Sequence, residues 1–179
     1  MQRLLPDVLE TERLLLRKPQ ASDAQAIFAA YAQDAEVSKY LIWSPHTSAA
    51  MTRTFIDDCI SAWESGEILP YVLTLRSSDE VLGMVEARVR GHTVDLGYVL
   101  ARGHWRKGFM SEALSALAAA ALSRGEIFRV QATCDVENIA SARVLETSGF
   151  RREGRLERYM VHPNVSPEPR ASFMYARCR

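Results

Sequence analysis

The sequence lacks any long apolar run, since no stretch approaches the roughly 18 residues of a membrane-spanning helix. It shows no signal-peptide core near its start, because Pro6 and Asp7 interrupt the first apolar residues. Its three cysteines (Cys59, Cys134 and Cys178) are odd in number and far apart, which fits a reducing compartment better than a disulfide scaffold. These absences predict a soluble protein of the cytoplasm.

The sequence also lacks an excess of charge, with 22 basic and 22 acidic side chains in 179 residues. Without a bulk electrostatic field, we expect no general binding to nucleic acid or to a membrane surface. A hydrophobic content of 47% excludes a disordered chain. The four histidines show no ligand spacing, so no metal site is expected. With no repeat and no linker, one domain over residues 1–179 is predicted.

Periodicity predicts a mixed α/β protein with about seven mostly antiparallel strands and about four helices. Strands are expected at residues 9–17, 69–76, 81–90, 93–100, 129–134, 150–160 and 172–178. One helix of about three turns follows Ser22 and Gln25, which form a capping-box pattern. The other helices are expected from Thr47 or Ser48 to Gly66, over 107–124 and over 138–148, with Met51, Phe55, Cys59 and Trp63 on one face of the second.

Two segments carry chemistry. The first is a loop with the basic residues Arg102, Arg106 and Lys107, followed by Gly108 and a long helix. A helix N-terminus beside a glycine and basic side chains suits a phosphate group, although a turn with solvated charges fits as well. The second runs from Asn138 to Phe150, where the asparagine is most simply a helix N-cap.

Taken together, the two segments resemble the GCN5-related N-acetyltransferase (GNAT) superfamily, in its ribosomal-protein alanine acetyltransferase-like (RimJ/RimL-like) branch. The resemblance covers nearly the whole chain, because the order and spacing of its motifs match from end to end. It rests on residues 11–17 with 22–24, on 83–86, on 96–100, on 105–113, and on 138–150 with Gly154.

This resemblance implies a sheet that splays between its fourth and fifth strands, with acetyl-CoA in the gap and a primary amine as acceptor. The acceptor would be a protein N-terminus or a small molecule, attacking the thioester directly. Nucleic acid, membrane and metal have no expected role, and the protein would be a monomer or a homodimer. The cofactor-binding residues implied are Tyr98, Val99, Leu100, Arg106, Lys107, Gly108, Phe109, Met110, Ser111 and Asn138.

The catalytic residues are less well defined by the resemblance. Many relatives carry a tyrosine seven residues after the motif's asparagine as general acid for the leaving thiolate, and here that position is Leu145. Ser141 is the nearest alternative by position. An attacking ammonium group must first lose a proton, and Asp95 is the first candidate base, with Glu86 second. Each carboxylate could equally be a surface residue of a strand.

The segment from Lys39 to His46, between the first two expected helices, is unusually aromatic for a loop. Tyr40 and Trp43 are the candidate acceptor-binding residues there, although both could simply pack over the sheet. Two functions therefore stay open. One is acetyl transfer to an amine, and the other is a non-catalytic acyl-CoA-binding regulatory module that has lost turnover.

Overall fold

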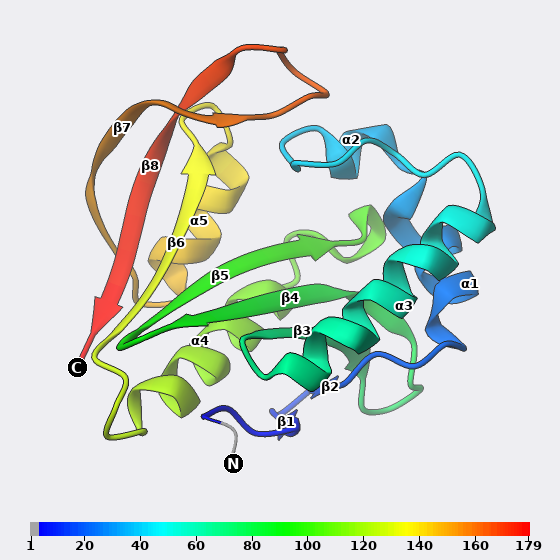
Figure 1. Ribbon diagram of the computed structural model, residues 1–179, viewed down its shortest axis with the longest axis horizontal. Helices are drawn as coiled ribbons and strands as arrows, with labels where there is room; N and C mark the ends of the chain where they lie inside the picture. The colour runs from blue at the N-terminus through cyan, green and yellow to red at the C-terminus, as the bar shows by residue number, and fades with distance from the viewer. Residues whose placement is uncertain (1–3) are drawn as a thin grey trace.

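The computed structural model describes residues 4–179 and contains one eight-stranded mixed sheet (Figure 1). The order of strands across the sheet is β1-β2-β3-β4-β5-β6-β8-β7. The strands are β1 (Val8–Glu10), β2 (Leu14–Arg17), β3 (Ile68–Leu75), β4 (Val81–Arg90), β5 (Thr93–Leu100), β6 (Arg129–Asp135), β7 (Arg151–Val161) and β8 (Pro169–Cys178).

Five α-helices surround this sheet. They are α1 (Asp23–Ile27), α2 (Ala35–Ser38), α3 (Ala49–Ser65), α4 (Phe109–Leu122) and α5 (Ile139–Thr147). A π-helical turn, η1 (Phe28–Ala32), extends α1, and a 3₁₀ turn, η2 (Arg102–His104), follows β5. Over residues 4–179, none of the helices is both long enough and apolar enough to cross a membrane.

The sheet splits between β5 and β6, as the resemblance implied, because these are the fourth and fifth of the strands expected from the sequence. These two strands are parallel and pair only at Thr93–Asp95 with Arg129–Gln131. Beyond those residues they diverge, so that β6, β8 and β7 lean away from the rest of the sheet (Figure 1). The edge of β5 from Leu96 to Leu100 therefore has no partner strand among the described residues. Its unpaired main-chain groups need another partner.

Helices cover both faces of the sheet. On one face the small-residue stripe Phe109, Ala113, Leu117 and Ala121 of α4 is buried, as its spacing predicts. On the other face α1 and α3 pack over β3 and β4 (Figure 1). The core face of α3 differs slightly from the expected one: Cys59 and Trp63 are buried with Thr52 and Ile56, whereas Met51 is exposed and Phe55 only partly buried.

The predicted first strand over 9–17 is wrong, because this segment forms a hairpin of two strands. Thr11 makes the turn: its N–H donates to the Leu14 carbonyl, and its hydroxyl accepts from the Leu14 N–H, each at 2.9 Å. Local hydrogen bonding by threonine competes here with a continuous ladder. The strand count is therefore eight rather than about seven.

The predicted capping box at Ser22 is also wrong. Ser22 has helical dihedral angles and makes no side-chain cap. The buried carboxylate of Asp23 instead accepts from the Gln20 N–H at 2.7 Å and from both terminal nitrogens of Arg17. Further along, Ser48 caps α3 as expected, and Gly66 ends it with a φ of 76°. The short helix α2, capped by Asp34, had no prediction.

Gly83 provides a test of the register between β4 and β5. A methyl group at this position would lie 2.1 Å from the carbonyl oxygen of Val99, which is rigid backbone. We therefore expect Gly83→Ala to lower the free energy of unfolding by about 2 kcal/mol or more, measured by urea denaturation. Gly154→Ala is the matched control, because this other strand glycine has no atom within 4 Å of an added methyl group. Equal stability of the two variants would contradict this reading of the strand pair.

Candidate active site in the split sheet

A cavity of about 1050 Å³ occupies the gap between β5 and β6. Its lining includes Gly108 and Ser111 at the start of α4, Tyr98 on β5, and Tyr40 and His162 across the sheet from them. The cavity therefore extends from the loop before α4, through the open edge of β5, to the face covered by α2 and α3. Such a passage can hold a long cofactor from one side and admit a second substrate from the other.

The loop before α4 has the geometry of an anion site. Gly108 is the N-cap in the left-handed conformation, with φ of 77°, and no side chain caps the helix. The first N–H groups of a helix have no partner within it, so those of Phe109, Met110 and Ser111 are suited to hold phosphate oxygens. Arg106 also lines the cavity and has a φ of 62°. Lys107 does not line it, and its carbonyl faces Arg13 instead.

Arg13 fixes this loop from the β1–β2 hairpin. Its side chain donates to the Lys107 carbonyl at 2.9 Å and to Glu112 Oε2 at 2.6 Å, and its guanidinium lies 4.5 Å from the ring centre of Phe109. Glu112 also accepts from the Thr11 hydroxyl at 2.5 Å. Burial acts to raise the pKa of Glu112, but the hydrogen bonds from Thr11 and Arg13 outweigh it and hold the pKa below its usual value.

The open edge of β5 supplies main-chain groups to the cavity. Tyr98, Val99 and Leu100, which the resemblance implies as cofactor-binding residues, all line it. The Leu100 carbonyl already accepts a hydrogen bond from the Trp105 indole at 2.8 Å, which ties the η2 turn to the strand end. Main-chain groups alternate along a strand, and the Val99 carbonyl lies against Gly83 of β4, so the groups that face the gap are those of Tyr98 and the N–H of Leu100.

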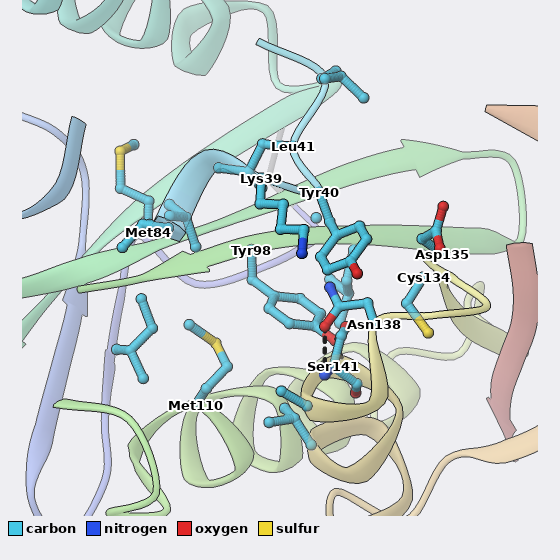
Figure 2. Close-up of a pocket in the computed structure, with 18 of the residues that line it drawn as sticks. Lys39, Tyr40, Leu41, Met84, Tyr98, Met110, Cys134, Asp135, Asn138 and Ser141 are labelled. Atoms are coloured by element: carbon cyan, nitrogen blue, oxygen red, sulfur yellow. Dashed lines mark hydrogen bonds between the residues drawn. The ribbon is translucent and has the colours of Figure 1, made fainter. Parts of the chain in front are cut away.

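The start of α5 faces β5 across the gap (Figure 2). The Asn138 side chain accepts from the Ser141 N–H at 3.1 Å, so the asparagine is the N-cap of α5. The Ser141 hydroxyl forms a 2.6 Å hydrogen bond with the hydroxyl of Tyr98. Burial raises the pKa of Tyr98, so its phenol stays protonated at neutral pH. Sequence reasoning considered only the main chain of Tyr98 and missed this hydroxyl pair.

The two candidate carboxylates line the cavity at the closed end of the gap. Glu86 on β4 forms a 2.5 Å ion pair with Arg88. Asp95 on β5 accepts a long hydrogen bond, 3.5 Å, from the Gln131 amide. Neighbouring core residues Val94 and Leu96 point toward α4, so alternation along the strand directs Asp95 to the other face. Both carboxylates are thus on the face of the sheet opposite α4, where α1 and α3 pack.

The aromatic segment lies on that same side. Tyr40 and Trp43 both line the cavity, and Figure 2 shows Tyr40 beside Asn138. Trp43 also packs against His46 and Phe55, with ring centres 5.2 and 6.5 Å apart, so it serves the core as well. A second wall is the loop after β7 that contains His162, a proline-rich segment that the sequence predicts to border the site. No local pattern singles out His162 itself, because its neighbours in space come from residues about 120 positions away.

Leu145, which stands where many relatives have a catalytic tyrosine, is fully buried in the core. Its aliphatic side chain packs α5 and can transfer no proton. Within residues 4–179, the structure contains no group of three or more His, Cys, Asp or Glu side chains that could hold a metal ion.

Comparison with known proteins agrees with this architecture. Residues 13–151 match the family model described as the acetyltransferase (GNAT) domain. The chain belongs to the GNAT family. It is 31% identical over 156 residues to a Bacillus licheniformis protein named as an uncharacterized N-acetyltransferase, p20. The aligned region covers 86% of this chain and 87% of that protein.

Two solved structures are similar to this GNAT chain over nearly its whole length. A GNAT-family acetyltransferase from Bacillus anthracis superimposes with a TM-score of 0.83 at 28% identity, covering 96% of this chain and 98% of that one. RimL, a ribosomal L7/L12 alpha-N-protein acetyltransferase solved with coenzyme A, gives a TM-score of 0.84 at 24% identity, covering 96% and 97%. The chain is accordingly an acetyl-CoA-dependent N-acetyltransferase, with RimL-like proteins among its structural neighbours. The comparisons thus favour the enzyme over the non-catalytic module.

Arg13 provides a test of the phosphate loop. Arg13→Ala removes the bond to the Lys107 carbonyl and leaves Glu112 without its cation, so the loop loses its fixed shape. We expect the Kd for acetyl-CoA, measured by calorimetry at moderate salt, to rise about tenfold, or about 1.4 kcal/mol. Glu12→Ala, an exposed neighbour in the same turn, should leave the Kd unchanged. An unchanged Kd in the Arg13 variant would show that the loop holds its shape without this clamp.

Proposed function

We propose that this N-acetyltransferase transfers the acetyl group to a primary amine, either a protein N-terminus or a small-molecule amine, by direct attack on the thioester. The observation that carries the proposal is the continuous cavity, which extends from the loop before α4, past β5, to the segment that contains Tyr40. Both substrates can then bind at once, and the amine reaches the thioester without a covalent enzyme intermediate.

The cofactor side follows from the geometry described above. The N–H groups at the start of α4, beside Gly108, would hold the pyrophosphate. The pantetheine arm would lie along the edge of β5 from Tyr98 to Leu100, with Asn138 on its other side. A main-chain N–H of this strand would polarise the thioester carbonyl, as in an oxyanion hole.

Ser141 is the proposed proton donor to the leaving group. The amine nitrogen forms a bond to the carbonyl carbon, the carbon–sulfur bond breaks, and the sulfur takes a proton from the Ser141 hydroxyl. The Tyr98 phenol, 2.6 Å from that hydroxyl, can pass its own proton to the serine oxygen and regains one from solvent as the products leave. This pair supplies from β5 the tyrosine that Leu145 does not provide on α5.

The acceptor side is rich in carboxylates that attract a cationic amine. Asp95 and Glu86 lie on this side, and the Glu86 charge is already balanced by Arg88. We therefore assign Asp95 the greater part in drawing the ammonium group toward the opening. Tyr40 and Trp43 would form the wall against which the rest of the acceptor packs.

The test of this function is thiol release from acetyl-CoA with a panel of amines. The panel includes short peptides with a free N-terminal serine or alanine, a polyamine and an amino sugar. We expect at least one class to be acetylated, with the product identified by mass spectrometry. Asp95→Asn should raise KM more than it lowers kcat, because it removes an attractive charge. A protein that binds acetyl-CoA but acetylates none of these amines would contradict the proposal.

Ser141→Ala tests the proton donor separately. General acid catalysis contributes about 10²–10⁴-fold, so we expect kcat to fall by about 100-fold while the Kd for acetyl-CoA stays within about twofold. Ser123→Ala, which removes an exposed hydroxyl at the far end of α4, is the control. A Ser141→Ala enzyme with wild-type kcat would exclude the serine as donor.

A further inference from the structure

His162 is a buried polar side chain on the acceptor side of the cavity. It directly follows β7, and only 7% of its side chain is exposed. Among the described residues, neither ring nitrogen has a hydrogen-bond partner of normal geometry. Buried imidazoles are almost always hydrogen-bonded, so an unsatisfied one that lines a cavity points to a ligand group as its missing partner.

A buried carboxylate lies behind this ring. The side chain of Asp135, at the end of β6, is completely buried, and its Oδ2 lies 3.8 Å from His162 Nε2. Arg170 binds Asp135 through two hydrogen bonds, of 2.6 and 3.1 Å, and the Glu137 N–H donates to it at 2.9 Å. Burial opposes ionisation of Asp135, but these bonds outweigh it and lower its pKa. The carboxylate is therefore charged and fixed.

The environment keeps the imidazole neutral at rest. Burial is the largest influence and lowers the pKa of His162, Asp135 acts to raise it, and Arg170 acts to lower it. The main-chain groups of Tyr40 and Leu41 also lie close enough to favour the protonated form. A neutral ring can accept a proton at pH 7, and the charge so formed would face the Asp135 carboxylate.

The remaining charged and titratable groups around the ring are few. Glu137 is paired with Arg170 at 2.8 Å, so its charge is balanced. The Tyr40 ring meets His162 edge-on, with ring centres 6.3 Å apart, and Lys39 lies 5.2 Å from the centre of that tyrosine ring. Tyr159 of β7 lines the same cavity.

The loop that carries His162 is held against the opposite wall. Asn164 donates one hydrogen bond to the Ser38 carbonyl at 2.7 Å and another to the Trp43 carbonyl at 2.8 Å. This amide joins the β7–β8 loop to the end of α2 and to the segment that follows it. His162 is thereby fixed beside Tyr40, on the wall that an acceptor must pass.

Other candidate bases on this face are already engaged. Glu86 is in an ion pair with Arg88, and Asp95 accepts from Gln131. His46, the other histidine that lines the cavity, is bound to the Thr52 hydroxyl through Nδ1 at 2.7 Å. Only His162 combines burial, an open hydrogen-bonding position and a fixed carboxylate behind it.

We propose that His162, oriented by Asp135, accepts the proton that the acceptor amine must lose in order to attack the thioester. The amine's N–H bond breaks, its proton moves to an imidazole nitrogen, and the freed electron pair forms the bond to the carbonyl carbon. The resulting imidazolium returns its proton to solvent after product leaves. This assignment rests on the proposed function, and it replaces Asp95 and Glu86 in the role of base.

The test is the pH dependence of kcat with an acetylated amine of high pKa from the panel. In the wild-type enzyme, kcat falls only at a pH below the usual histidine range, where the ring with its lowered pKa becomes protonated. In His162→Gln, kcat at pH 7 falls by about 100-fold. It then rises with pH, following the loss of the amine's own proton. An amine of low pKa, already neutral at pH 7, is acetylated by His162→Gln nearly as fast as by wild type.

His92→Gln is the matched control, because His92 lies in the exposed turn between β4 and β5 and does not line the cavity. Unchanged thermal melting and acetyl-CoA affinity in His162→Gln exclude misfolding, and an NMR titration of the His162 ring in the wild type reports its pKa directly. A variant with a wild-type pH profile overturns the base while leaving the proposed function intact. A wild type that acetylates no amine overturns both.

Discussion

The end of the β5–β6 ladder after Asp95 is the constraint on which the rest of the structure depends. Backbone polar groups rarely remain unpaired away from water, so a strand edge facing the interior needs a partner. Here the partner position is a cavity, and an extended ligand with amide groups can complete the ladder as a missing strand would. In the binding mode we propose, the cofactor is recognised by main-chain geometry more than by side-chain identity.

Polar contacts fix the width of the gap between β5 and β6 at both of its ends. At the closed end, Gln131 of β6 reaches Asp95 of β5, and the strands still pair. At the open end, the Tyr98–Ser141 hydrogen bond sets the distance between β5 and α5, while Trp105 fastens the η2 turn to Leu100. These polar contacts hold the walls in place, whereas the hydrophobic core beneath α4 holds the sheet as a whole.

Much of this organisation could be predicted from the sequence. The meander from β3 to β5, the helix after Gly108, and Asn138 as an N-cap all depend on local patterns, and each is observed. The two incorrect predictions, the single first strand and the capping box at Ser22, failed because of hydrogen bonds made by nearby side chains. Thr11 turns the chain within the expected strand by hydrogen-bonding to Leu14, and Asp23, not Ser22, makes the side-chain hydrogen bonds at the start of α1.

The parts of the site that escaped prediction depend on distant pairings. The surroundings of His162 are formed where β6 and the β7–β8 loop contact the segment after α2. Sequence periodicity reports local structure only, so it could not predict these long-range contacts. The hydroxyl of Tyr98 is a similar case, because its partner Ser141 is 43 residues away. Order and spacing of motifs identify the cofactor half well, but leave the acceptor half to tertiary structure.

The bridge made by Asn164 has a consequence for how such enzymes diversify. It binds two main-chain carbonyls, not two side chains, so the bridge does not depend directly on the identity of the side chains at positions 38 and 43. Mutations in the aromatic segment can then remodel the entrance while its frame persists. Evolution could change which amines the enzyme accepts by substitutions in this segment, while the residues that bind the cofactor stay the same.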